Sequence, residues 1–269
     1  MVVKGKTKRK GNQKYIVLKK ASTFHQPIAY IVLFFFLVIT GFNFHAGITM
    51  LNNARGTTTV VEAFFNTMYF WFPFLLVFPF TTMRVFAEES KMGTIETLMT
   101  APVRDSQVVL AKYAGALFFY LVLWVPSLLY FVTFQLVTGL SAGGTSYTGS
   151  YIGAYMGVFL GAYSILFLMG MLYTSIGCLA SALTDNQIVA AMISFAAILA
   201  LFFLGLLSFI MPASGAFIRE VTYYFSPIEH MMDFSRGIVD SRPIVFYISS
   251  TLLVLFATLH VFQYRRWKS

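Results

Sequence analysis

Six apolar runs, each long enough to cross a membrane as a helix, dominate this sequence. They cover residues 28–50, 63–83, 106–138, 151–181, 188–211 and 244–262. A membrane-spanning helix needs about 20 mostly apolar residues. Only 11% of the chain is charged, whereas a soluble domain carries about 25% charged residues. The sequence therefore predicts an all-α polytopic membrane protein whose six-span domain covers residues 28–262.

The basic residues predict how these spans are oriented. Eight of the nineteen Lys and Arg residues lie within the first twenty positions, and three more lie in residues 263–269. With six spans, fifteen of the nineteen fall on the side of the two termini, and four fall on the other: Arg55, Arg219, Arg236 and Arg242. Because basic segments favour the cytoplasmic side, we expect both termini in the cytoplasm.

Residues 1–27 are predicted to form a basic tail with an interfacial helix. Within residues 13–25, apolar side chains can face lipid while Lys14, Lys19 and Lys20 face lipid headgroups. A basic tail held only by attraction to anionic lipid is an equal alternative. Residues 263–269 are predicted to be a second basic tail in the cytoplasm.

The connection between the second and third runs, residues 84–105, carries a distinct pattern. Its first part can continue the second helix out of the membrane until Gly93, and Thr94 can cap a second short helix. In that helix, Glu96 places a carboxylate in the first turn. Ile95, Leu98 and Met99 form its apolar side. We expect a short amphipathic helix at the mouth between two spans, with a solvated loop as an equal alternative.

One run in this connection carries a family resemblance. It consists of Glu88, Glu89, Gly93, Thr94, Ile95, Glu96, Thr97, Leu98, Thr100, Pro102 and Val103. Further matching segments are Lys112–Tyr113, residues 181–187, and Ser226–Pro227 through Gly237. Together they resemble the type-2 ABC transporter permeases, in particular the gliding-motility and copper-enzyme-maturation subset.

The resemblance implies a permease subunit, usually of an exporter, in the bacterial inner membrane. It implies a second permease, identical or homologous, and two copies of a cytoplasmic ABC ATPase as partners, with no nucleic acid and no cofactor on this chain. The residues that would contact the ATPase are Glu88, Glu89, Gly93, Thr94, Ile95, Glu96 and Leu98, with Asp185 in the short turn 182–187 as a further contact. The chain lacks a phosphate-binding loop of its own, so it is not expected to be an enzyme.

The connection between the fifth and sixth runs predicts short external helices that do not cross the membrane. Ser226 can be the N-cap of a helix with Pro227 at its first position and Glu229 at its third. Asp233 and Arg236 are spaced to pair along that helix. A metal site made of Glu229, His230 and Asp233 is a less favoured alternative, because the three do not share one tight face.

The fourth run carries glycines at four-residue steps, Gly153, Gly157 and Gly161. Small residues at this spacing let helix backbones approach closely in a membrane. We therefore expect helix packing, within one subunit or across a dimer, in preference to a role in lining a substrate path.

Two other classes of membrane protein compete with the permease interpretation. An ion-coupled secondary transporter or a channel usually places ionisable residues near the middle of its spans. Here Glu62, Arg84, Lys112 and His260 lie near the ends of runs, and only His45 is ambiguous. An intramembrane enzyme would need a catalytic motif such as H-E-x-x-H or G-x-S-x-G, and the sequence has neither. These patterns favour the ATP-driven interpretation.

Overall fold

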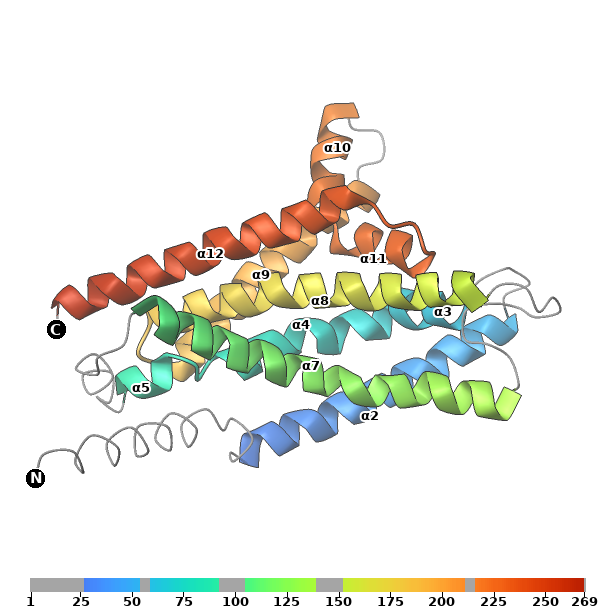
Figure 1. The fold of residues 1–269 in the computed structure, drawn as a ribbon, viewed down its shortest axis with the longest axis horizontal. Helices are drawn as coiled ribbons and strands as arrows, with labels where there is room; N and C mark the ends of the chain where they lie inside the picture. Colours follow the sequence, from blue (N-terminus) through green and yellow to red (C-terminus); the bar gives the residue numbers. More distant parts are fainter. Residues whose placement is uncertain (1–26, 54–58, 92–104, 139–151, 211–215, 269) are drawn as a thin grey trace, which may run out of the picture.

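The computed structural model describes residues 27–53, 59–91, 105–138, 152–210 and 216–268. Within these ranges the regular elements are all α-helices. Six stretches are long and apolar enough to span a membrane: Tyr30–Leu51, Met68–Lys91, Asp105–Val137, Gly157–Leu183, Gln187–Leu207 and Ser241–Arg265. They form an elongated bundle in which successive spans alternate in direction (Figure 1). The predicted all-helical, six-span fold is confirmed.

Five long helices correspond to predicted runs: α2 (Pro27–Asn53), α7 (Asp105–Thr138), α8 (Ile152–Leu183), α9 (Gln187–Ile210) and α12 (Ser241–Lys268). The last of these continues well beyond residue 262, so residues 263–268 extend the final helix and are not a separate tail. After Pro243 no Gly or Pro interrupts the sequence, which leaves nothing to break the helix.

The second apolar run is not one continuous helix, contrary to the prediction over residues 63–83. It is divided into α3 (Val60–Asn66) and α4 (Met68–Thr82) by Thr67, whose φ of −70° and ψ of 140° are extended. Two local contacts support the division. Thr59 caps α3 by accepting a hydrogen bond from the Glu62 amide at 3.0 Å, and the Thr67 hydroxyl donates back to Ala63 O at 2.5 Å. The span therefore begins at Met68.

Three short helices complete the described fold: α5 (Ala87–Lys91), α10 (Ala216–Phe225) and α11 (Pro227–Ser235). α10 projects away from the bundle, whereas α11 lies beside α8 and α3 (Figure 1). Neither α10 nor α11 is long enough to span a membrane, so this connection folds as short helices as predicted. The expected interfacial helix over residues 13–25 and the expected coupling helix after Gly93 lie outside the described residues.

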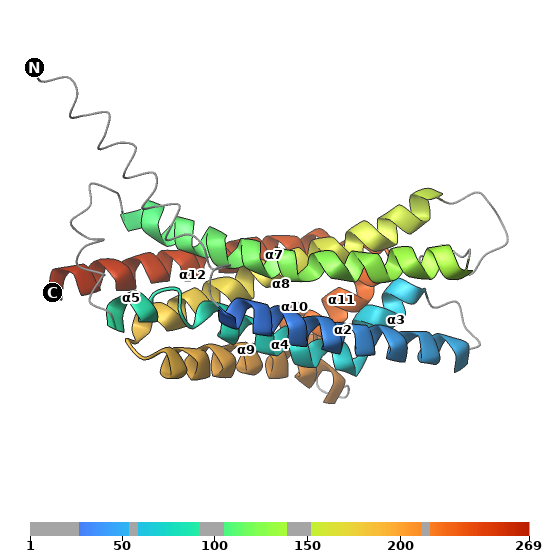
Figure 2. The same ribbon diagram turned by 90° about the horizontal axis from the view of Figure 1, so that it is seen from below.

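Helix α8 is the centre of the bundle. Its span is 83% buried, whereas the spans of α2, α9 and α12 are each 22% buried. It contacts α3, α4, α7, α9, α11 and α12, with α7 and α12 on one side and α4 and α9 on the other (Figure 2). The peripheral helices therefore present most of the apolar surface to the surroundings.

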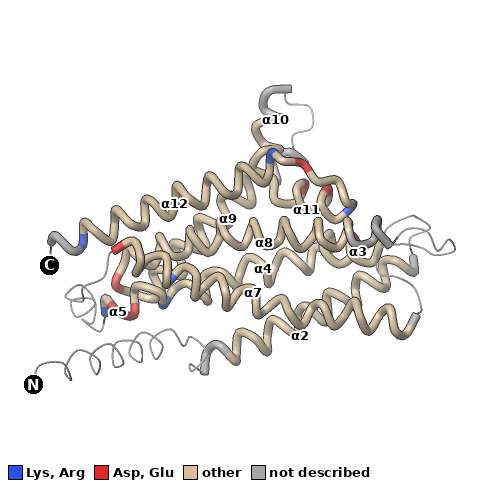
Figure 3. Tube along the Cα trace, in the orientation of Figure 1, with Lys and Arg blue, Asp and Glu red and all other residues tan. Residues whose placement is uncertain are grey.

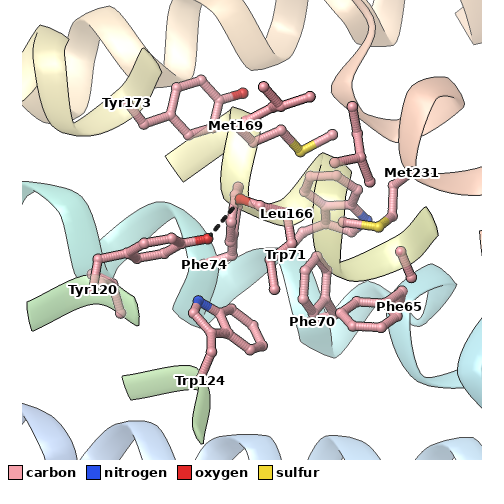
Figure 4. Packing of buried hydrophobic residues seen from close by; sticks show 14 of the residues in the cluster. Phe65, Phe70, Trp71, Phe74, Tyr120, Trp124, Leu166, Met169, Tyr173 and Met231 are labelled. Atoms are coloured by element: carbon pink, nitrogen blue, oxygen red, sulfur yellow. Dashed lines mark hydrogen bonds between the residues drawn. The ribbon is translucent and has the colours of Figure 1, made fainter. Parts of the chain in front are cut away.

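The core of the bundle is an aromatic cluster contributed mainly by α3, α4, α7 and α8 (Figure 4). Phe70 packs against Trp124 with ring centroids 5.6 Å apart, and Phe78 packs against Tyr120 at 5.0 Å. The Tyr120 hydroxyl donates to Leu166 O at 3.0 Å (Figure 4). Because lipid is as apolar as these side chains, their association depends on close packing and on such buried hydrogen bonds.

Among the described residues, charged residues gather toward the two ends of the bundle and are sparse between them (Figure 3). We call the end that holds α5, the α8–α9 turn and the last turns of α12 the α5 end. The opposite end, which holds α3, α11 and the start of α12, is the α11 end. The candidate site residues lie at these two ends.

Candidate functional site

The predicted ATPase-contact residues divide into described and undescribed positions. Glu88 and Glu89 lie in the first turn of α5, and Asp185 lies in the turn between α8 and α9. The other predicted contacts lie outside the described residues: Gly93, Thr94, Ile95, Glu96 and Leu98. The structure therefore describes the two helices that flank the segment 92–104 in the sequence, α5 and α7.

Ser181, near the end of α8, holds the turn that precedes α5. Its hydroxyl accepts hydrogen bonds from the amides of Phe86 at 3.0 Å and Ala87 at 3.1 Å, and it donates to Met83 O at 3.2 Å. The start of a helix leaves backbone amides without helical partners. A buried side chain from another helix satisfies two of them here, which ties α5 to α8.

Lys112, in the third turn of α7, joins the same turn to the third span. Its ammonium group donates to Glu89 Oε2 at 2.5 Å and to Val85 O at 2.6 Å, and lies 4.6 Å from the centre of the Phe86 ring. The two side chains of the ion pair are only 17% and 20% exposed. Glu89, a predicted ATPase contact, is thus also engaged in an ion pair within the chain.

Asp185 joins the α8–α9 turn to α5 and to the last turns of α12. Its carboxylate accepts hydrogen bonds from the Ser90 hydroxyl and, at 2.7 Å, from Arg265 Nη1. The Ser90 hydrogen bond, together with the Arg265 guanidinium, lowers the pKa of Asp185 below its usual range. The Asp185 side chain is still 67% exposed, so it can also meet a partner from outside the bundle.

A small apolar layer lies directly beneath these polar contacts. Phe86, Val109, Cys178 and Phe262 are buried in it together with Tyr113, Ala182 and Leu255. Phe86 and Phe262 bring the start of α5 against α12, with ring centroids 5.9 Å apart. The α5 end is therefore a cross-link of four helices, α5, α7, α8 and α12, with polar contacts outside and an apolar layer inside.

Comparison with known proteins supplies the family. Residues 18–200 match the family model described as ABC-2 family transporter protein, which is more than half of the 269-residue chain. The chain belongs to the ABC-2 transporter family. It is therefore a multi-pass membrane permease component of an ABC transporter, and the matched residues include α5, Lys112, Ser181 and Asp185. No curated protein matches the sequence.

At the α11 end of this ABC-2 family protein, the predicted helix start is present in α11. The Ser226 hydroxyl accepts from the Glu229 amide at 3.3 Å, and Pro227 occupies the first helical position. The cap fits against α9, because a Cβ on Gly205 would lie 2.6 Å from Ser226 Cα. Gly237, which follows the end of α11, has a φ of 82°, a conformation that glycine adopts without strain.

The predicted pair of Asp233 with Arg236 is wrong. Arg236 Nε donates instead to Glu62 Oε1 on α3 at 2.8 Å, while Asp233 accepts from the Tyr223 hydroxyl of α10 at 2.7 Å. Each side chain thus links α11 to another helix. The i,i+3 spacing allowed the local pair, but Glu62 on α3 and Tyr223 on α10 bind these groups instead.

His230, a residue type common in catalytic and metal sites, is buried at this end of the molecule. It is 1% exposed, and its Nδ1 lies 3.1 Å from the Tyr247 hydroxyl of α12. Burial lowers the pKa of His230 to about 4. Within the described ranges, no group of three or more His, Cys, Asp or Glu residues is arranged to hold a metal ion. The histidine therefore joins α11 to α12 in its neutral form.

The glycines of α8 differ in what they contact. A Cβ on Gly161 would lie 2.5 Å from Phe234 O of α11, whereas a Cβ on Gly157 would meet nothing within 4 Å. Gly153 lies in the first turn of α8. Two glycines that the four-residue pattern missed are also in close contact, Gly170 with the Tyr120 ring and Gly177 with the Thr82 side chain. One sequence signal could have indicated them: both glycines lie inside an apolar helix, where glycine lowers helix stability by about 1 kcal/mol relative to alanine.

Proposed function

We propose that this chain is the membrane-spanning permease subunit of an ABC exporter, completed by a second permease, identical or homologous, and by two copies of a cytoplasmic ABC ATPase. Membership of the ABC-2 family supports an ABC ATPase as partner. The observation that carries the proposal is the cross-link at the α5 end, where Lys112, Ser181 and Asp185 join α5 to three other helices.

The arrangement suits a mechanical connection between an ATPase and the spans. The segment 92–104 leaves α5 and enters α7 directly, so a displacement of this segment pulls on both helices. A movement of α5 would be passed to α7 through the Glu89–Lys112 ion pair, and to the turn before α9 through the Ser90–Asp185 hydrogen bond. We propose that Glu88, Gly93, Thr94, Ile95, Glu96 and Leu98 contact the ATPase, and that Asp185 adds a second contact because it is exposed.

A transporter driven in this way must present its α5 end to the cytoplasm, in a bacterial inner membrane. The bias of basic residues toward that end supports this orientation. Single cysteines replacing Lys8, Thr145 and Trp267, in a Cys178→Ser background, test it with a membrane-impermeant thiol reagent on intact cells. We expect labelling only at position 145. Labelling at position 8 or 267 from outside would contradict the orientation.

The coupling role is tested by expressing the chain with its ATPase. We expect Glu96→Ala combined with Leu98→Asp to reduce recovery of the ATPase in a pull-down, or to reduce permease-stimulated ATP hydrolysis in proteoliposomes. Neither substitution lies in a span, so insertion and folding are preserved. Asp240→Asn, an exposed carboxylate change at the α11 end, is the matched control and leaves both measurements unchanged. If the double variant behaves like the control, the segment does not couple the two subunits.

A further inference from the structure

An open groove of about 420 Å³ lies between α10 and the first turns of α12. Its lining combines one cation, hydroxyl groups and apolar side chains: Tyr224, Ser241, Arg242, Val245, Phe246 and Ser249. The residues from α12 recur at four-residue steps, so they form one face of that helix over two turns. Nothing in the coupling mechanism at the α5 end uses this groove.

Aromatic packing holds the two walls of the groove together. The rings of Phe225 on α10 and Phe246 on α12 meet edge to face, with centroids 5.4 Å apart. The groove is therefore a product of how α10 projects from the bundle beside α12 (Figure 1). Phe246 and Val245 supply apolar side chains to its lining.

Arg242 supplies a cation at the mouth of the groove. Its side chain is 61% exposed, and its ion pair with Asp240, at 4.0 Å, is the longest of the four in the described residues. An exposed pair at that distance contributes little. A guanidinium has five N–H donors, so Arg242 can bind a second anion. Phosphate oxygens fit this geometry well, because two N–H groups can donate to them in parallel.

Beyond Arg242 along α12, exposed apolar side chains continue from the groove-lining residue Val245. Val245, Ile248 and Leu252 are 64%, 41% and 63% exposed, and their spacing places them on one face of the helix. From Arg242 to Leu252 the helix rises about 15 Å, which is about half the hydrocarbon thickness of a bilayer. This apolar strip therefore matches the depth of one acyl chain, with the cation at headgroup level.

We propose that the groove between α10 and α12 binds one anionic membrane phospholipid, with its phosphate on Arg242 and an acyl chain along Val245 and Leu252. A lipid is favoured over a soluble phosphate compound, since exposed apolar side chains of α12, Val245, Ile248 and Leu252, continue beyond the cation. Bound there, the lipid contacts both α10 and α12 and fills the space between them.

The test is titration of the full chain in detergent with phosphatidylglycerol, followed by native mass spectrometry. We expect Arg242→Gln to raise the dissociation constant about tenfold, because it removes charge-assisted hydrogen bonds, and Arg242→Lys to have a smaller effect. Val245→Trp, which fills the groove, is expected to lower occupancy. Leu129→Trp is the matched control, since Leu129 is 62% exposed and belongs to α7, which contributes nothing to the lining of the groove.

Two further probes separate the lipid from its parts. Diacylglycerol with the same acyl chains lacks the phosphate and is expected to bind at least tenfold more weakly, as charge-assisted contacts are lost. Inorganic phosphate at millimolar concentration is expected not to displace phosphatidylglycerol. Equal retention of diacylglycerol, displacement by phosphate, or unchanged binding in both Arg242→Gln and Val245→Trp would each overturn the proposal.

Discussion

The two ends of the bundle are both held by polar contacts, but they are built differently. At the α5 end, side chains bridge separate helices through donors and acceptors that can shift: Lys112 to Glu89, and Arg265 to Asp185. At the α11 end, backbones are in direct contact, as shown by Gly161 against Phe234 O and by Gly205 against Ser226. Long polar side chains can follow a movement, whereas backbone contacts cannot be displaced without opening the packing. The α5 end is thus suited to transmit motion and the α11 end to resist it.

The largest effect is expected from Gly161→Ala at the α11 end. The new Cβ would meet the carbonyl of Phe234 at 2.5 Å, and α11 must move away, at a cost of about 3 kcal/mol. Unfolding of the purified protein in mixed detergent micelles measures this loss. Gly157→Ala, four residues earlier in the same helix, meets open space and should leave the protein as stable or slightly more stable. Equal destabilisation by both changes would contradict the close approach of α8 and α11.

A second difference between the ends concerns pH. Because burial holds the pKa of His230 near 4, below the value of about 6.5 for a free histidine, the unfolded chain takes up a proton that the folded chain does not. The stabilisation from neutral His230 is complete above pH 6.5 and is lost as the pH falls toward 4. Roughly 2 kcal/mol should be lost between pH 7 and 4.5, measured by unfolding at each pH.

Replacement of His230 tests the origin of this pH dependence. Two carboxylates, Asp233 and Asp240, lie near His230. The Tyr223 ring meets it edge to face, and Tyr247 faces it from α12. We expect His230→Gln to flatten the profile between pH 6.5 and 4.5. His45→Gln, at an exposed position of α2, is expected to leave it unchanged. A profile that keeps its slope without His230 would assign the proton uptake to another group.

A third comparison sets the ion pairs of the two ends against each other. Lys112→Met should cost about 1–2 kcal/mol, because the side chains of this pair are mostly buried and Glu89 loses a close cation. The double variant with Glu89→Gln should recover part of that loss. Arg236→Met with Glu62→Gln, whose arginine is 49% exposed, should give a coupling energy below about 1 kcal/mol. Equal coupling in the two cycles would remove this distinction between the ends.

The smallest effect is expected at Asp185. Its pKa is lowered in the folded chain, so its stabilising contribution is present above a pH of about 4 and is lost as the pH falls further. Because the side chain is 67% exposed, the contribution should stay below about 1 kcal/mol. Asp185→Asn should remove this acid-dependent loss while leaving the His230 step at higher pH intact. Loss of both steps would show that the two ends unfold as one coupled unit.

The sequence predicted features whose causes are local. The six spans follow from runs of apolar residues, and the cap of α11 follows from Ser226, Pro227 and Glu229 standing next to one another. The division of the second run at Thr67 was missed, since apolar content continues across it and the extended backbone at Thr67 depends on α3 packing against α2 and α8. Composition measures whether a segment can enter lipid, and it is insensitive to one residue that leaves the helical conformation.

The residues that pair with one another at the candidate site could not be predicted from local sequence patterns. Lys112 pairs with a residue 23 positions away, and Ser181 and Asp185 bond to residues about 95 positions away. One signal was present: a lysine inside an apolar run needs a partner, although nothing in the sequence names Glu89. Likewise, glycines along α8 were recognisable, but only the positions of α4, α7 and α11 select Gly161, Gly170 and Gly177 over Gly157.

By itself the sequence determined that this chain is a six-span helical membrane protein with its charges at the helix ends, because the cost of placing polar groups in lipid acts on each segment separately. The tertiary structure decided which charges meet, which glycines are indispensable, and that α10 and α12 enclose a groove beside Arg242. Those outcomes depend on distances between helices far apart in the chain, and such distances are set only when all the helices pack together.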